Sequence, residues 1–475
     1  LTKNYTNTDG YSSNGITISN SITIDGKGHT INANQQGRIF NIANGVSVTL
    51  KNIKLINGKT TGSGTAGYGG AIYNNGGSVT VEDSTFTNTT ANTGGAIYSY
   101  LGSITVTNSN FTNTTATNNY GGAIYNTGVG SVTVVTNSNF TNTTANTHGG
   151  AIYNTGSGSV TVTNSSFTNT TAQYGGAIYN TGSVTVEDST FTNTTANNSG
   201  GAIYNRYGSV TVANSTFNDN SAKGNGASIY TIGVLNVKDS SFNSQNANGT
   251  AIIYIESSNS DVNLTNNTIE SNLLAIYNNG GKIISPTTLT FQNVTVEEGE
   301  NATLTAVLTD DNGNIIGSNT NVNGKVGNND VPFVFNETTM NFTAVYNETT
   351  TKGKYTVTGT YSKATDCNVI NGTLTVGNTP DFKDLQDIID AASPAGTVYL
   401  NGTNYVAKPG QNNVIINKTL TIIGGSENDP SLSSTLDANG QCRIFNITHG
   451  VMVVLMNLTF INGNATSEGG AIYTD

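Results

Sequence analysis

Charged residues are scarce in this 475-residue chain, because Lys, Arg, Asp and Glu together make up only 10% of it. An average soluble domain has about 25%. The net charge of −11 repels phosphate backbones and anionic membrane surfaces, and no cluster of Lys and Arg offsets it. We therefore expect neither nucleic-acid binding nor adsorption to such membranes. Because no run of 18 apolar residues occurs, we also expect no membrane insertion by this segment.

Cysteine, proline and tryptophan are rare or absent. Cys367 and Cys442 are too few for a disulfide scaffold, and their spacing fits no metal motif. Only six prolines occur, and Asn, Thr, Ser and Gly are interleaved with Val, Ile, Phe and Tyr. This composition argues against a proline-rich linker and favours many short strands and turns. The sequence therefore predicts an all-β protein.

One pentapeptide, Gly-Gly-Ala-Ile-Tyr, recurs throughout the first half of the chain. Complete copies end at Tyr73, Tyr98, Tyr125, Tyr153, Tyr179 and Tyr204, and degenerate copies end at Tyr230, Tyr254 and Tyr277. Successive copies lie 23–28 residues apart, a period typical of solenoid coils. Each period contains three short extended pieces separated by turn residues, and such a unit buries its apolar face only by stacking on its neighbours. We predict a parallel β-helix of about eleven coils and three sheets over residues 1–285.

Two residue columns accompany each coil. Phe86, Phe111, Phe140, Phe167, Phe191, Phe217 and Phe242 are expected to form an internal aromatic stack. Three residues before each Phe stands Asp83, Asn108, Asn137, Asn164, Asp188, Asn214 or Asp239. Asn and Asp tolerate left-handed backbone, so we interpret this second column as turn residues, with a calcium or substrate site as the alternative.

Two further modules follow the coils. Alternating strands joined by turn signals over residues 286–377 predict an immunoglobulin-like β-sandwich, in which the run 310–314 is a hairpin turn rather than a calcium loop. Residues 381–392 are then predicted to form a helix, the only one that we expect in the chain. After it, Arg443-Ile444-Phe445 repeats Arg38-Ile39-Phe40 at an offset of 405 residues. Residues 378–475 are therefore expected to hold a capping helix and the first coils of a second, truncated β-helix, within a window of a longer tandem array.

The coil motif resembles the Gly-Gly-Ala-Ile and Phe-x-x-Asn repeats of polymorphic outer-membrane proteins. The whole layout is similar to adhesin-like surface proteins of methanogenic archaea, which alternate pectin-lyase-like β-helices with bacterial immunoglobulin-like domains. In this chain Asn usually falls two residues after Phe, as in Phe86-Thr87-Asn88. The resemblance implies right-handed β-helices and a large archaeal cell-surface glycoprotein that acts in cell adhesion or in a surface filament, and it supplies no catalytic residues.

Enzymes also occur among parallel β-helices, so the chemistry of the coils decides between the classes. Residues 84–186 contain no Asp, Glu, Lys or Arg, although glycoside hydrolysis needs paired carboxylates and β-elimination needs a base. His148 is the one imidazole of that stretch, and we expect it to be an exposed turn residue. We therefore predict no catalytic residue, no metal site and no cofactor.

Two sets of residues are candidates for surface function. Strand alternation places the tyrosines of the pentapeptide on the outside, which predicts an exposed stripe that stabilises the solenoid, packs on another module or binds surface glycans. The second set consists of Asn-x-Ser/Thr sequons, which we expect to be exposed and partly glycosylated. The stripe comprises Tyr73, Tyr98, Tyr125, Tyr153, Tyr179 and Tyr204, and the candidate sequons are Asn88, Asn113, Asn142, Asn169, Asn193, Asn293, Asn336, Asn347 and Asn457.

Together these features predict a non-enzymatic extracellular protein of the cell surface, an adhesin-like stalk or fibre segment. Its expected partners are other modules of a tandem array, further copies of itself and surface glycans. Two alternatives stay open. One is a structural filament subunit joined end to end through its modules, and the other is a polysaccharide lyase or hydrolase of the β-helix type.

Overall fold

The computed structural model describes residues 1–10, 12–129, 131–377, 380–427, 429, 432–465 and 469–474. The chain divides into two compact units, which are taken in turn. The first comprises Leu1–Phe291, Thr305–Ala344 and Thr358–Asn371, and the second comprises Gln292–Leu304, Val345–Val357 and Gly372–Asp475.

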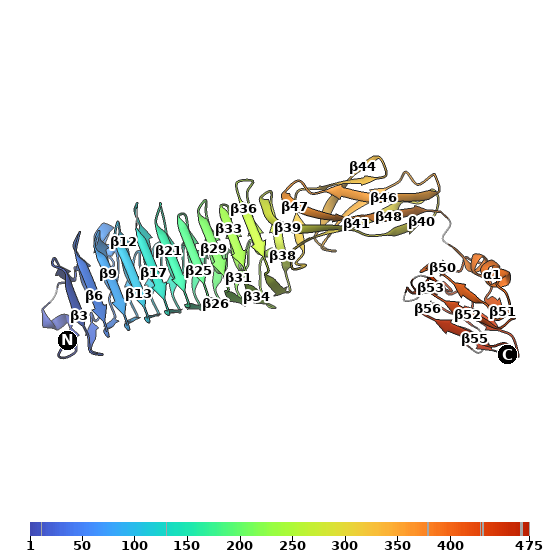
Figure 1. The fold of residues 1–475 in the computed structure, drawn as a ribbon. Coiled ribbons are helices and arrows are strands. Elements are labelled where there is room, and N and C mark those ends of the chain that lie inside the picture. Colours follow the sequence, from blue (N-terminus) through green and yellow to red (C-terminus); the bar gives the residue numbers. More distant parts are fainter. Residues whose placement is uncertain are drawn as a thin grey trace. The chain divides into compact units, whose positions relative to one another are not determined.

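Stacked coils of short parallel strands build the first part of unit 1, which confirms the predicted all-β solenoid (Figure 1). Each coil contributes one strand to each of three sheets, and equivalent residues of successive coils pair in register, as Phe86 does with Phe111. The first sheet, named the Phe sheet, has eleven strands, in agreement with the predicted number of coils. Its strands are β1 (Tyr5–Thr6), β4 (Thr30–Asn32), β7 (Lys54–Ile56), β10 (Thr85–Thr87), β14 (Asn110–Thr112), β18 (Asn139–Thr141), β22 (Ser166–Thr168), β26 (Thr190–Thr192), β30 (Thr216–Asn218), β34 (Ser241–Ser244) and β37 (Thr268–Ser271).

The other two long sheets carry the pentapeptide tyrosines and the valines of the coil motif. The Tyr sheet consists of β2 (Ile16–Ile18), β5 (Phe40–Ile42), β8 (Ile72–Asn75), β12 (Ile97–Tyr100), β16 (Ile124–Thr127), β20 (Ile152–Asn154), β24 (Ile178–Asn180), β28 (Ile203–Asn205), β32 (Ile229–Thr231), β35 (Ala251–Ile255), β38 (Leu274–Asn278) and β42 (Ile316–Ser318). The Val sheet begins with β3 (Ile22–Asp25), β6 (Ser47–Lys51), β9 (Ser78–Glu82), β13 (Ser103–Thr107), β17 (Val132–Thr136), β21 (Ser159–Thr163), β25 (Ser183–Glu187), β29 (Ser209–Ala213), β33 (Val234–Lys238), β36 (Asp261–Thr265) and β39 (Lys282–Phe291).

A fourth, six-stranded sheet was not predicted. It forms where the Thr-Thr-Ala sequence turns away from the Phe strand, because the alanine of each coil points into the core and its preceding threonine pairs with the next coil. The strands are β11 (Thr90–Ala91), β15 (Thr115–Ala116), β19 (Thr144–Ala145), β23 (Thr171–Tyr174), β27 (Thr195–Ser199) and β31 (Ser221–Ala222).

The predicted Phe column lies inside the solenoid, where all seven rings are fully buried. Adjacent rings are stacked with centroids 4.5–4.8 Å apart and planes within 10° of parallel. Since the rings belong to paired residues of successive strands, the stack follows directly from the register of the Phe sheet. The stacked rings therefore form a continuous apolar column in the core of the solenoid.

Several buried asparagine side chains are hydrogen-bonded from coil to coil. The residue after each pentapeptide tyrosine is often asparagine, and Asn126, Asn154, Asn180 and Asn205 are all completely buried. Each of the first three donates from Nδ2 to the Oδ1 of the next, at 2.9–3.0 Å. Because an unpaired buried amide N–H would be costly, this ladder favours the observed register of these four coils.

The far end of the solenoid continues directly into the next strands of unit 1. β39 pairs with β36 in parallel at Lys282 and Ile283 and then, from Thr287 on, pairs with β41 (Ala302–Asp310) in antiparallel fashion. β39 therefore runs unbroken through residue 285, where we predicted a domain boundary. At the same position of the last coil, Asn278 Nδ2 donates to the hydroxyl of Tyr361, which donates to Ser318.

Antiparallel pairing characterises much of the predicted sandwich. In unit 1, β43 (Val322–Val326), β44 (Asn329–Asn336) and β45 (Asn341–Tyr346) pair in this way, while β39 pairs in parallel with β47 (Ala364–Ile370). Residues 310–314 form the turn between β41 and β42, with Gly313 at φ +83° and the Asp310 carboxylate accepting from two backbone amides of the turn. The relation of residues 286–377 to immunoglobulin domains stays a prediction.

Unit 2 contains the remaining strands of residues 286–377 and the start of the second solenoid. β48 (Gly372–Val376) pairs with β40 (Val294–Val296) and with β46 (Gly353–Thr360). The predicted boundary after residue 377 adjoins residues 378–379, which lie outside the described residues. Three three-stranded parallel sheets follow, made by β49 (Thr397–Tyr399), β52 (Leu420–Ile423) and β55 (Val453–Met456), by β50 (Tyr405–Val406), β53 (Ser434–Asp437) and β56 (Leu458–Ile461), and by β51 (Val414–Ile416), β54 (Phe445–Ile447) and β57 (Ile472–Thr474).

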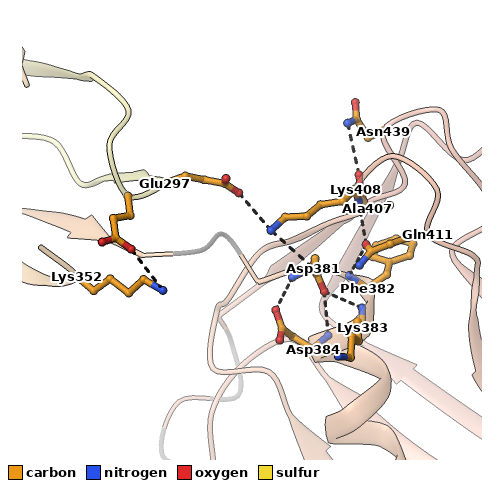
Figure 2. A network of polar contacts seen from close by, with 11 residues as sticks. Glu297, Lys352, Asp381, Phe382, Lys383, Asp384, Ala407, Lys408, Gln411 and Asn439 are labelled. Atoms are coloured by element: carbon orange, nitrogen blue, oxygen red, sulfur yellow. Dashed lines mark hydrogen bonds and ion pairs between the residues drawn. The ribbon is translucent and has the colours of Figure 1, made fainter. Parts of the chain in front are cut away.

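Helix α1 (Phe382–Ala391) packs against the first coil of this second solenoid. Asp381 caps the helix by accepting hydrogen bonds from the backbone amides of Lys383 and Asp384. Figure 2 shows the ammonium of Lys408 between two carboxylates, 3.7 Å from Asp381 and 3.5 Å from Glu297. The cap and the ion pairs together anchor the start of the helix.

Candidate functional site

The tyrosine stripe is present, but it is not exposed. Tyr98, Tyr179 and Tyr204 are buried, and Tyr73, Tyr125 and Tyr153 are half-buried. All of the rings lie on the outer side of the Tyr sheet, where those of successive copies stack with centroids 4.6–5.7 Å apart. Mutual stacking covers their faces, which the alternation argument does not take into account.

A second layer of rings further covers the stripe. Tyr68, Tyr120, His148 and Tyr174 each directly precede a Gly-Gly pair, and the turn that they occupy lies against the stripe. Tyr68, for example, stacks on Tyr98 with centroids 4.3 Å apart. These residues were not predicted as partners of the stripe. The signal that could have found them is the aromatic residue in the same slot of several coils.

His148 is the one imidazole of this layer, and it is half-buried rather than exposed as we predicted. Its ring contacts Tyr179 edge-on, with the ring centroids 4.4 Å apart, and stacks on Tyr174, with the centroids 5.2 Å apart. Nδ1 is buried without a hydrogen-bond partner among the described residues. Burial, with a smaller contribution from the positive charge of Arg206, lowers the pKa of His148 from 6.5 to about 4.

We expect acid to destabilise the coils around His148. The unfolded chain takes up the proton at its ordinary pKa of 6.5 while the folded chain resists it, so stability is complete above pH 6.5 and falls as the pH approaches 4. After a discount for the partial exposure of the ring, we expect His148 to account for about 1–2 kcal/mol of the free energy of unfolding that is lost in acid. The variant His148→Tyr, which has the residue found in this slot of the neighbouring coils, should not show this part of the loss. Urea unfolding at pH 7.5 and pH 4.5 measures it. An equal pH dependence in both proteins would contradict the assignment.

The sequon asparagines of the coils form an exposed ladder, named the sequon ladder, of Asn88, Asn113, Asn142, Asn169 and Asn193. Each has a left-handed backbone, with φ of 52–54°. Nδ2 of Asn113 donates to Oδ1 of Asn88 at 3.2 Å, and the same bond links Asn142 to Asn113 and Asn169 to Asn142. The exposure of these five asparagines agrees with the expectation. The ladder, however, uses their Nδ2 atoms as hydrogen-bond donors, and Nδ2 is the atom to which a glycan would be attached.

The remaining sequons lie outside the solenoid coils of unit 1. Asn293, Asn347 and Asn457 are exposed, and Asn336 is half-buried. Asn293 accepts a hydrogen bond from the backbone amide of Thr373, and Asn336 accepts from Thr338 and Thr339. Their glycosylation stays a prediction.

A second exposed ladder comprises the column of Asx residues before each Phe. The seven predicted members all have φ of 47–51°, which confirms them as turn residues. Nδ2 of Asn108 donates to Asp83, Asn137 to Asn108 and Asn164 to Asn137, at 2.7–3.1 Å. Two parallel rows of Asn and Asp side chains therefore flank the outward polar side chains of the Phe sheet, such as those of Thr85 and Thr87, and amides predominate in both rows.

Among the described residues, Lys408 lies between the carboxylates of Asp381 and Glu297. Across all of the described residues, no group of three or more His, Cys, Asp and Glu side chains is arranged to hold a metal ion. Nor does the described part of the chain contain a helix long and apolar enough to cross a bilayer. No protein-family model matches the chain, and neither a curated protein nor a solved structure shows significant similarity to it.

Proposed function

We propose that the chain is a non-enzymatic extracellular protein of the cell surface, an adhesin-like stalk or fibre segment. One observation carries the proposal. The same side chains recur in register from coil to coil, so that the surface chemistry is repeated along the solenoid. The two exposed amide ladders are the evidence for this repetition on the surface, and the stacked Phe rings show the same register in the core.

Such a construction suits a stalk. Parallel pairing between every two coils, the internal Phe stack and the buried amide ladder all resist separation of the coils. The passage of β39 from the solenoid into antiparallel pairing joins two kinds of module of unit 1 without a flexible linker. A stiff spacer of this kind holds a binding surface away from the cell.

The outer faces also suit weak, repeated contacts with neutral polar ligands. Amides and hydroxyls form regular rows on the Phe sheet, and residues 84–186 carry no charged side chain of Lys, Arg, Asp or Glu. Individually such contacts are weak, whereas many in a row add through multivalency. Surface glycans are the ligand class that we propose, in line with the resemblance to archaeal adhesin-like proteins.

A glycan array read beside an assay for uronate cleavage tests this proposal. We expect the full chain to bind polymeric neutral glycans without cleaving any of the glycans, and to bind their monomers at least ten-fold more weakly because of multivalency. Exposed Asn139 offers a variant, Asn139→Lys, that interrupts the row on the Phe sheet and should weaken binding. Exposed Asn347, outside the solenoid, offers the matched control Asn347→Lys. Cleavage of a polysaccharide by the full chain would contradict the proposal.

A further inference from the structure

The first coil of the first solenoid has an open, apolar groove of about 570 Å³. Its lining includes Tyr5, Ile16, Ile22 and Ile24, which lie on β1, β2 and β3. β1 and β2 are the edge strands of their sheets. Ile16 is 39% exposed and Ile22 is 49% exposed, unusual values for residues at core positions of the coil.

Unit 2 contains the equivalent coil, and strand pairing identifies the matching residues. Val414 pairs with Phe445 as Ile16 pairs with Phe40, and Leu420 pairs with Val453 as Ile22 pairs with Val48. By the same criterion, Tyr405 corresponds to Tyr5 and Ile422 to Ile24. In unit 2 these positions are closed, since Val414 is 1% exposed and Leu420 is 2% exposed.

The cover over the coil of unit 2 is a helix followed by a strand. Phe382, Leu385 and Ile389 of α1 are buried in one apolar cluster with the lining of that coil. Val398 of β49 then pairs in parallel with Ile422, which extends the sheet by one strand. Unit 2 therefore shows that a helix followed by a strand can cover the first coil of such a solenoid.

Polar contacts fix the register of that cover. The side-chain amide of Gln386 accepts from the backbone N–H of Ile415 at 2.7 Å and donates to its carbonyl at 3.0 Å. The helix thus provides hydrogen-bond partners for the backbone of Ile415 at the edge of β51. The matching edge residue of β2 is the exposed Thr17. An edge strand of this kind accepts an added segment through the same backbone groups.

We infer that the groove at the first coil is a docking site for a helix–strand segment with the chemistry of residues 381–400. The helix would place three apolar side chains, at the spacing of Phe382, Leu385 and Ile389, over β1 and β2. Its Gln would bond to the backbone of Thr17, and the following strand would pair with β3. The inference goes beyond the proposed adhesive role and does not depend on it.

A fluorescent peptide of residues 380–401 tests the inference by anisotropy with the full chain. We expect saturable binding, which Ile22→Asp in the chain weakens at least ten-fold. A Leu385→Asp peptide should bind at least ten-fold more weakly as well. Ile22 is already half exposed, so the variant should fold, and Ile16→Asp provides a second one. Exposed Val454 in unit 2 offers the matched control, Val454→Asp, which should leave binding unchanged.

A cysteine pair checks the placement. In a chain with Cys367→Ser and Cys442→Ser, we expect Thr17→Cys to form a disulfide with a Gln386→Cys peptide, and exposed Thr23→Cys to form less of it. Absence of binding, or binding unaffected by both Ile22→Asp and Ile16→Asp, would overturn the inference. Dimers in sedimentation that Ile22→Asp abolishes would also overturn it, since a second copy would then occupy the groove.

Discussion

Replacing Phe140 with alanine is expected to lower the free energy of unfolding by about 3–5 kcal/mol, the usual cost of truncating a buried phenylalanine. Phe140 is fully buried in the middle of the Phe stack and contacts Phe111 and Phe167 with ring centroids 4.8 Å away on both sides. Its removal leaves a cavity between two rings that backbone pairing holds in place. Urea unfolding followed by circular dichroism measures the change.

A conservative variant separates stacking from burial at the same position. Phe140→Leu keeps an apolar side chain, so we expect a loss of about 1–2 kcal/mol. If Phe140→Ala were as stable as the parent chain, the ring would not be part of a packed core. The Phe stack could then not hold the coils together.

Replacing Gly150 with alanine is the other change with a large expected effect, about 3 kcal/mol or more. Gly150 is the second glycine of a pentapeptide copy, and a Cβ there would overlap the carbonyl oxygen of Gly176 in the next coil. It would also lie 2.7 Å from the backbone nitrogen of Thr171. Both obstacles are backbone atoms of a paired coil, so relief of the clash requires the coils to separate.

Gly156 offers the matched control for Gly150. Its φ is +71° and a Cβ there would meet nothing within 4 Å, so Gly156→Ala tests backbone strain without a clash. We expect it to cost about 1 kcal/mol. Thermal unfolding of both variants shows the difference, and equal losses would contradict the steric explanation.

The coil architecture could be predicted because the repeat puts the same residue type at the same place in each period. The Phe column, the turn column of Asp83 and its equivalents, and the number of coils all follow from that alignment. The second glycine of the pentapeptide illustrates why the repeat is so strict. In the complete copies a Cβ at this position would meet backbone atoms of the next coil, whereas two of the degenerate copies have Ala227 and Ala251 there.

The surface could be predicted less well, because exposure depends on which turns lie over a strand. Alternation correctly sends Tyr98 and Tyr179 outward, but it does not reveal that Tyr68 and His148 cover them. The continuation of β39 beyond the solenoid was missed for a similar reason. Its partners β36 and β41 come from two modules, and only the folded chain shows that one strand serves both.

Immunogold labelling of intact cells that produce the protein tests its proposed place on the cell surface most directly. An antibody against the turn at Arg206 and Tyr207 is suitable, since Tyr207 is 68% exposed. We predict that intact cells are labelled as strongly as permeabilised ones, with gold particles outside the cell envelope. Labelling that appears only after permeabilisation would contradict the account.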